Sequence, residues 1–219
     1  MSSTRAATTA AVEQAGIVAV IRIKEPARLR AVVDALAEGG LRAIEVTMTV
    51  PGAIGLIAEL SPHMPEGFLL GAGTVIDADT VRRVVDAGAR YIVSPVFRRS
   101  VLEACHSLDV AVMPGCFSPT EILDAWEMGA DVVKVFPATA LGPGYIKDIR
   151  GPLPQVKLMP TGGVTLDNAG DWIRAGAVAV GVGTALTDAT AIAAGDYAKL
   201  RANAERIVAN VRAARGNAS

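Results

Sequence analysis

The sequence predicts an α/β protein, a (β/α)8 TIM barrel with an extra N-terminal helix. Short apolar runs recur about every 20–25 residues, and each is followed by a segment with helical periodicity. This alternation is typical of a parallel sheet covered by helices. Eight runs occur, the number of strands that closes such a barrel. An open nucleotide-binding sheet is disfavoured because its glycine fingerprint is absent after the first run.

The predicted strands, in order, are GIVAVIR (16–22), RAIEVT (42–47), FLLGAG (68–73), RYIVSP (90–95), VAVMPG (110–115), DVVKVFP (131–137), QVKLMP (155–160) and AVAVGVG (177–183). Helices are predicted at 26–38, 51–60, 78–87, 98–108, 118–128, 143–150, 165–175 and 196–214. Several end in glycine signals, namely EGG, DAGA, EMGA and RAGA. We expect residues 1–15 to form the extra helix across the bottom of the barrel, and 16–219 to form one barrel domain.

Composition narrows the classes of partner. The 219 residues suit a single domain, and 51% hydrophobic content with only 4% aromatic residues favours packing through small, branched side chains. The 21 basic and 22 acidic residues nearly cancel, without a basic block, so a nucleic-acid or membrane-surface protein is not indicated. We expect small-molecule partners. No apolar run reaches the ~20 residues of a membrane span, and the N-terminal segment does not resemble a signal peptide, which favours a cytoplasmic protein.

Lys134 interrupts an apolar strand. It lies within Val132-Val133-Lys134-Val135-Phe136, so both faces of the strand are apolar. Burial lowers the pKa of a lysine and leaves more free amine to attack a carbonyl. The alternative is a structural lysine that pairs with a carboxylate or reaches water, and the segment alone leaves both open.

Glu45 interrupts a second apolar strand, Ala43-Ile44-Glu45-Val46-Thr47. An unpaired carboxylate in a core is costly. It therefore either forms a buried salt bridge with Lys134 or carries protons at an imine, and the two roles are compatible.

Further candidates follow the first three strands. Arg22 ends strand one, where its guanidinium suits a substrate carboxylate; the alternative is a rim residue paired with Glu25 or Asp34. Hydroxyls follow the next two strands, either for substrate or as loop caps, at Thr47, Thr49 and Thr74.

Two glycine-rich loops follow the last two strands, PTGGV (160–164) and GVGTA (181–185), and both precede predicted helices. Glycine lets backbone N–H groups approach a phosphate, and helix N-termini favour its charge. The pair predicts a phosphate site. By contrast, the two histidines and two cysteines do not indicate a metal site, a disulfide or a nucleophile.

At this point the sequence resembles a known family, the 2-keto-3-deoxy-6-phosphogluconate (KDPG) aldolases, also known as 4-hydroxy-2-oxoglutarate (KHG) aldolases. The matching stretches are IVAVIR, GGLRAIEVTMTVP, GAGTV, IVSP, MPGCFSPTE, VKVFPA, GPGYIK, PTGGV and VGVGTAL, in family order across the whole chain. The resemblance implies a trimeric barrel that reversibly cleaves 2-dehydro-3-deoxy-6-phosphogluconate to pyruvate and glyceraldehyde 3-phosphate, without metal or other cofactor.

The resemblance also implies roles for residues. Lys134 matches the Schiff-base lysine, and Glu45 matches the general acid/base. The pyruvate-derived part of the substrate would lie among Thr74, Pro95, Phe136 and Thr161, and the phosphate end among Gly162, Gly163, Gly183 and Thr184.

One departure bears on the substrate. Many gluconate-type members carry an arginine two residues after EVT, where this chain has Thr49. We hypothesise that Arg22 binds the carboxylate instead. Galactonate-type members also have an arginine at strand one, so 2-dehydro-3-deoxy-6-phosphogalactonate and 4-hydroxy-2-oxoglutarate remain alternative substrates. The alternative functions are a different phosphate-binding barrel, such as a metal-dependent epimerase, and a non-catalytic sugar-phosphate binder. The epimerase is disfavoured because both histidines lie away from the strand ends, and the non-catalytic binder because both Lys134 and Glu45 are present.

Overall fold

Strands and helices alternate along the chain in the computed structural model, which describes residues 4–216. The strands are β1 Ile17–Ile21, β2 Ala43–Thr47, β3 Leu69–Gly73, β4 Tyr91–Val93, β5 Ala111–Met113, β6 Gly115–Cys116, β7 Val133–Val135, β8 Leu158–Pro160 and β9 Val180–Val182. The α-helices are α1 Thr4–Ala15, α2 Leu29–Glu38, α3 Ala53–Leu60, α4 Ala78–Asp86, α5 Arg99–Ser107, α6 Pro119–Glu127, α7 Gly142–Arg150, α8 Ala169–Arg174, α9 Ala189–Ala194 and α10 Tyr197–Gly216. Short 3₁₀ helices cover Pro26–Arg28, Ser61–His63 and Ala138–Ala140. The ends of the predicted extension and barrel domain, residues 1–3 and 217–219, lie outside the described residues.

Local signals explain most helix boundaries. Asp77 caps α4 by accepting a hydrogen bond of 2.7 Å from the Thr80 N–H, and Ser118 forms a capping box with Glu121 at the start of α6. The predicted glycine signals are confirmed, since the glycine after each of four helices has positive φ: Gly40 (+93°), Gly88 (+106°), Gly129 (+92°) and Gly176 (+106°).

Two helix predictions need correction. The predicted helix at 165–175 begins late, at Ala169, because the Asn168 side chain accepts a hydrogen bond from the Thr165 N–H and holds the preceding residues in a turn. The sequence analysis also missed α9, a six-residue helix capped by Asp188. Its run of alanines carries little periodic signal.

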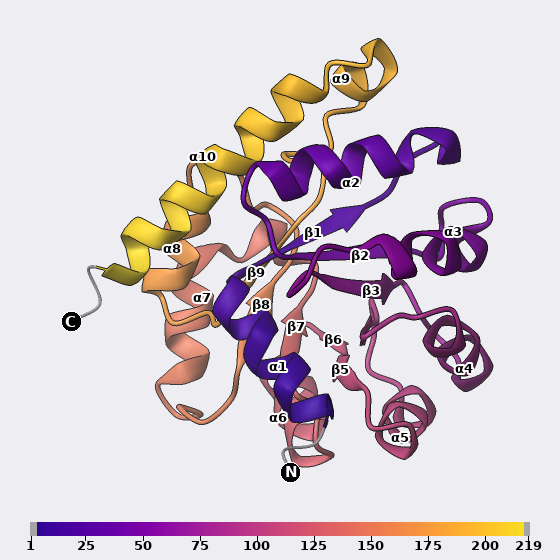
Figure 1. Cartoon of the computed structure of the whole chain (residues 1–219). Coiled ribbons are helices and arrows are strands. Elements are labelled where there is room, and N and C mark those ends of the chain that lie inside the picture. Colours follow the sequence, from indigo (N-terminus) through magenta and orange to yellow (C-terminus); the bar gives the residue numbers. More distant parts are fainter. Residues whose placement is uncertain (1–3, 217–219) are drawn as a thin grey trace.

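All strand pairs are parallel, and the sheet curls with helices around it (Figure 1). The prediction of one closed eight-stranded barrel is only partly met. The strands form a six-stranded sheet, β5-β4-β3-β2-β1-β9, and a three-stranded sheet, β6-β7-β8. The fifth apolar run splits into β5 and β6 at Pro114, which has no N–H to donate. Between β8 and β9, the Thr161–Gly181 bridge and a 3.0 Å hydrogen bond from the Val178 N–H to the Leu158 carbonyl replace a full ladder.

The strands bury two apolar clusters. The larger, outer cluster packs the sheet against α2 to α10. The smaller one, the interior cluster, draws side chains from both sheets: Val12, Val18, Ala43, Leu69, Tyr91, Val93, Ala111, Met113, Val132, Met159 and Ala179. Alternate residues along each strand therefore point into one shared interior, as the period of two requires.

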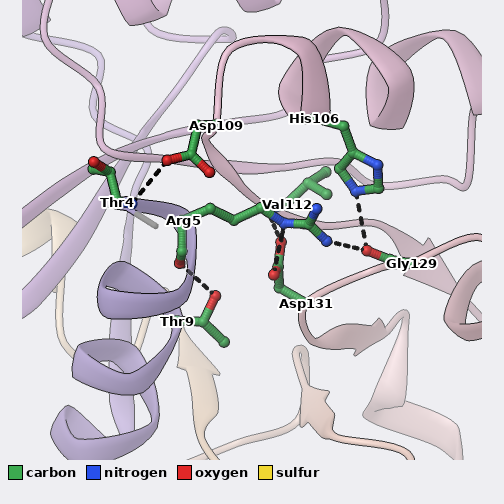
Figure 2. Close-up of polar contacts among 8 residues, drawn as sticks. All are labelled: Thr4, Arg5, Thr9, His106, Asp109, Val112, Gly129 and Asp131. Carbon is green, nitrogen blue, oxygen red and sulfur yellow. Dashed lines mark hydrogen bonds and ion pairs between the residues drawn. The ribbon is translucent and has the colours of Figure 1, made fainter. Parts of the chain in front are cut away.

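Helix α1 closes the amino-terminal side of this interior. Its Val12 is fully buried in the interior cluster. Figure 2 shows Arg5 of α1 reaching the Asp131 carboxylate, 2.9 Å from Nε, and the Gly129 carbonyl, to which His106 also points. We call Arg5, His106, Gly129 and Asp131 the amino-terminal clamp. These contacts attach α1 to the segment that immediately precedes β7, the strand that carries Lys134. Because His106 takes part in them, its role is structural.

Candidate active site

Lys134 lies at the centre of β7, between Gly115 of β6 and Met159 of β8. Only 5% of it is exposed. Its Nζ lies 4.8 Å from the centroid of the Phe136 ring, a distance at which the ring face attracts a cation. Gly115 adds no side chain beside it, and the backbone of Pro95 lies close on that flank, where a Cβ on Gly115 would come within 2.3 Å of the Pro95 carbonyl oxygen.

Burial lowers the pKa of Lys134 below its ordinary value of 10.5. The Glu45 charge acts in the opposite sense, and the Arg22 charge reinforces the decrease. Lys134 and Glu45 are both buried within reach of each other's charge, and the exposed Arg22 lies close enough for its charge to act on both. Desolvation dominates, so a larger fraction of the amine is unprotonated and nucleophilic near neutral pH.

Glu45 is 1% exposed on β2, and its Oε2 has no hydrogen-bond partner among the described residues. Burial raises the pKa of Glu45 above 4.5, against the charges of Lys134 and Arg22. No salt bridge within 4.0 Å joins Glu45 to Lys134 in residues 4–216. A carboxyl group with a raised pKa and an unused oxygen is suited to gaining and losing protons during a reaction.

Arg22 follows β1 and is exposed. The alternative partners proposed for it are occupied: Glu25 pairs with Arg28 at 2.6 Å and Asp34 with Arg30 at 2.9 Å. Arg22 itself forms no ion pair within the described residues. Its guanidinium is thus available to an anionic ligand beside Lys134 and Glu45.

The threonines divide into two kinds. The Thr47 hydroxyl is fully buried, 3.2 Å from the Ile21 carbonyl and 2.7 Å from the Thr49 hydroxyl, so both threonines are engaged in holding the loop after β2. Thr74 instead is half-buried with φ +60°, a left-handed conformation that costs energy in a non-glycine residue. Such strained residues cluster at functional sites.

Thr161 follows β8 and has a buried hydroxyl without a hydrogen-bond partner among the described residues. It lies against Gly181, where an added Cβ would come within 2.2 Å of the Thr161 Oγ1. Pro95 and Phe136 are half-buried at the ends of β4 and β7. Strand order and direction therefore bring Thr161, Phe136 and Pro95 to the same carboxyl-terminal edge as Lys134.

The glycine loops adjoin one another because the Thr161–Gly181 bridge sets β8 beside β9. Gly162 and Gly163 have φ of +93° and +73°. Four backbone N–H groups at this edge make no hydrogen bond to another described residue: Gly162, Gly163, Gly183 and Thr184. One expectation fails, since turns separate both loops from the helices α8 and α9, so no helix N-terminus lies directly on either loop.

The chain is similar to known proteins along most of its length. The family model for KDPG and KHG aldolase matches residues 8–203. The chain belongs to this family. It is an aldolase, a carbon–carbon lyase.

Relatives of two named activities are similar to this aldolase. A probable 2-dehydro-3-deoxy-6-phosphogalactonate aldolase of Rhizobium meliloti is 37% identical, covering 78% of this chain and 81% of the relative. A 2-dehydro-3-deoxy-phosphogluconate aldolase of Pseudomonas aeruginosa is 35% identical, covering 85% of each chain. The crystal structure of the Legionella pneumophila KDPG aldolase, with pyruvate captured as a covalent carbinolamine, is 32% identical with a TM-score of 0.84, covering 91% of this chain and 97% of that one.

The sequence analysis missed two contributors to the site. Gly73 of β3 lies against the Glu45 carboxylate, since a Cβ there would come within 2.6 Å of Oε1. Tyr91 of β4 lies in the interior cluster close enough for the Glu45 charge to raise its pKa further. Alternation within FLLGAG and RYIVSP assigns both to the inner face, but it does not reveal which strands they meet.

Proposed function

We propose that this aldolase is of class I, with Lys134 as the Schiff-base residue and Glu45 as its proton carrier. The observation that carries the proposal is a lysine with a lowered pKa on β7 and a carboxyl group with a raised pKa on β2, both buried and without a direct ion pair. The carbinolamine named in the Legionella structure supports the same chemistry for a relative.

In the proposed reaction, the unprotonated Nζ of Lys134 adds to the C2 carbonyl of a 2-oxo acid. Glu45 protonates the carbinolamine hydroxyl, which leaves as water to give a protonated imine and a Glu45 carboxylate. Glu45 removes the C4 hydroxyl proton, the C3–C4 bond breaks, and its electron pair moves into the enamine as the aldehyde leaves. Glu45 then returns the proton to C3. Hydrolysis releases pyruvate and restores Lys134.

For the substrate, we propose 2-dehydro-3-deoxy-6-phosphogluconate, which yields pyruvate and glyceraldehyde 3-phosphate. Arg22, Thr74 and Thr161 would surround the carboxylate and pyruvate part, together with Pro95, Phe136 and, through the loop that it holds, Thr47. The unpaired N–H groups of Gly162, Gly163, Gly183 and Thr184 would bind the phosphate.

A specific observation favours the galactonate isomer as a second candidate. Arg22 is unpaired, whereas Thr49 is bonded to Thr47 where many gluconate-type members carry arginine. The substrate is assigned by comparing turnover of the two phosphorylated isomers with that of unphosphorylated 4-hydroxy-2-oxoglutarate. Turnover is measured as release of pyruvate in a coupled assay. Preference for 4-hydroxy-2-oxoglutarate would contradict the phosphate site.

The test of mechanism is borohydride reduction in the presence of pyruvate, followed by peptide mass analysis. We expect a pyruvate adduct on Lys134. Trapping at another lysine, such as Lys147 or Lys157, or turnover by a Lys134→Met variant at the wild-type rate, would remove Lys134 from the chemistry.

We further propose that both sheets complete a (β/α)8 barrel forming one domain, supported by the shared interior cluster and the bridge between β8 and β9.

We also propose a homotrimer. This assembly is supported by three apolar side chains that follow β3, β4 and β6 and are 45–49% exposed, namely Ile76, Val96 and Phe117. Light scattering of the wild type and a Phe117→Ser variant checks the assembly.

A cytoplasmic location remains a prediction. Within residues 4–216, no helix has the length and apolar character to cross a bilayer.

A further inference from the structure

Two glycines of β3 face the interior of the sheet beside Glu45. A Cβ on Gly71 would lie 2.4 Å from the Tyr91 ring, and a Cβ on Gly73 would lie 2.6 Å from the Glu45 Oε1. Both side chains therefore lie in contact with the bare backbone of β3. Contacts this close exclude any larger residue at either position unless the neighbour moves.

Tyr91 uses the space over Gly71 to cross from β4 to β2. It is fully buried in the interior cluster, and its hydroxyl donates a 2.5 Å hydrogen bond to the Ile44 carbonyl. β3 lies between β4 and β2 in the sheet, so a side chain at position 71 would block this path. The bond attaches the Tyr91 ring to the strand residue that immediately precedes Glu45.

The register places the ring beside Glu45. Glu45 pairs with Gly71 across β2 and β3, and Thr47 pairs with Gly73. With the Tyr91 ring over Gly71, the space directly opposite Glu45 is filled. The Glu45 carboxylate lies instead against Gly73, two residues nearer the carboxyl-terminal end of β3 and thus nearer the edge where the substrate would enter.

The Tyr91 hydroxyl keeps its proton over the neutral pH range. Burial raises the pKa of Tyr91 well above 10.0, and the nearby Glu45 charge adds to the increase. The phenol therefore remains a hydrogen-bond donor to Ile44 while Glu45 gains and loses protons. Its link to β2 does not change during the reaction.

We propose that Tyr91 is a positioning residue that holds the Glu45 carboxylate against Gly73, through its ring over Gly71 and its hydrogen bond to Ile44. This inference rests on the proposed role of Glu45 as proton carrier. Tyr91 itself does not contact the reacting atoms. A phenylalanine at position 91 would fill the same space without the bond to β2.

The test is Tyr91→Phe in the full-length protein. We expect kcat to fall about 10-fold with KM within about 2-fold of wild type, because proton transfer depends on placement more than substrate binding does. Deuterium exchange at the pyruvate methyl group, followed by NMR, should slow by a similar factor. Borohydride trapping of pyruvate on Lys134 should be unchanged.

Matched variants separate positioning from general disturbance. Tyr197→Phe removes a phenol from the start of α10 and should leave kcat unchanged. Gly71→Ala should slow exchange as Tyr91→Phe does, whereas Gly55→Ala on α3, with nothing within 4 Å of the added Cβ, should not.

A Tyr91→Phe kcat within about 2-fold of wild type would overturn the inference. So would a parallel loss of kcat, pyruvate affinity and trapping, which indicates a disturbed pocket. Failure of the underlying function has a different signature, since Glu45→Gln would then leave methyl exchange at the wild-type rate regardless of Tyr91.

Discussion

Replacing Arg22 by alanine tests how the proposed site holds a substrate carboxylate. Arg22 is exposed and forms no ion pair within residues 4–216, so its removal leaves no buried partner unsatisfied. Surface changes of this kind alter the free energy of unfolding by roughly 0.5 kcal/mol or less. Any large effect of the variant must then come from substrate.

The magnitude follows from the contact that would be lost. A hydrogen bond to a charged group contributes about 1.5–3 kcal/mol, and a bidentate guanidinium lies at the upper end of that range. Arg22→Ala should therefore raise KM for the 2-oxo acid roughly 10- to 150-fold. Arg22→Lys keeps the charge but not the planar guanidinium, so its KM should lie between those of Arg22→Ala and wild type.

A second readout comes from charge. The Arg22 guanidinium helps to lower the pKa of Lys134, so the pKa of Lys134 should rise when Arg22 is removed. A higher pKa leaves less free amine at neutral pH. The pH at which pyruvate trapping on Lys134 reaches half its maximum should accordingly move upward.

The assay is steady-state kinetics with coupled pyruvate detection, together with borohydride trapping from pH 5 to pH 9. Lys24→Ala, which removes an exposed positive charge two residues away, is the matched control and should behave as wild type. Wild-type KM and an unmoved trapping profile in Arg22→Ala would exclude Arg22 from the site. Equal effects in both variants would point to a general surface charge instead of a specific contact.

Three further outcomes are expected. Because burial raises the pKa of Glu45 above its ordinary value of 4.5, the folded wild type loses stability as the pH rises above about 4.5. The Tm of Glu45→Gln, by calorimetry, should therefore rise relative to wild type as the pH is raised, and a constant difference would contradict this. Gly73→Ala should lower kcat at least 10-fold by displacing the carboxylate, with Gly55→Ala unaffected; normal kcat would show that the carboxylate tolerates movement. Arg5→Ala should lower the free energy of unfolding by about 1–3 kcal/mol in urea titrations. Arg82 forms an exposed pair with Asp79, so the free energy of unfolding of Arg82→Ala should lie within about 0.5 kcal/mol of wild type. Similar losses in both variants would show that the amino-terminal clamp has no special role.

Periodicity predicted the fold well where the signal is local. Every predicted apolar run contains a strand, and the glycines after four helices take the expected left-handed conformation. The sequence did not reveal that Pro114 divides the fifth run or that β8 and β9 share little more than one bridge. Ladder continuity depends on tertiary geometry, which a pattern of apolar residues does not encode.

The burial of the two candidate ionisable residues was predictable from the sequence. Lys134 and Glu45 stand out because charge is rare within apolar strands, and both are buried as expected. Tyr91 gave no such signal, since a tyrosine in a strand is ordinary. Its importance depends on Gly71 being bare on the neighbouring strand, a relation between residues twenty positions apart.

Helix α1 covers the amino-terminal end of the interior. With Val12 buried beneath the strands, a ligand bound at Lys134 has no exit on the amino-terminal side. Under the proposed reaction, both products must leave through the mouth by which the substrate entered. The aldehyde, which would be held near the exposed Gly163 and Thr184, leaves first, and pyruvate on Lys134 follows. In synthesis the order reverses, so pyruvate must bind before any aldehyde, and we expect the loops at the rim to help select the acceptor aldehyde.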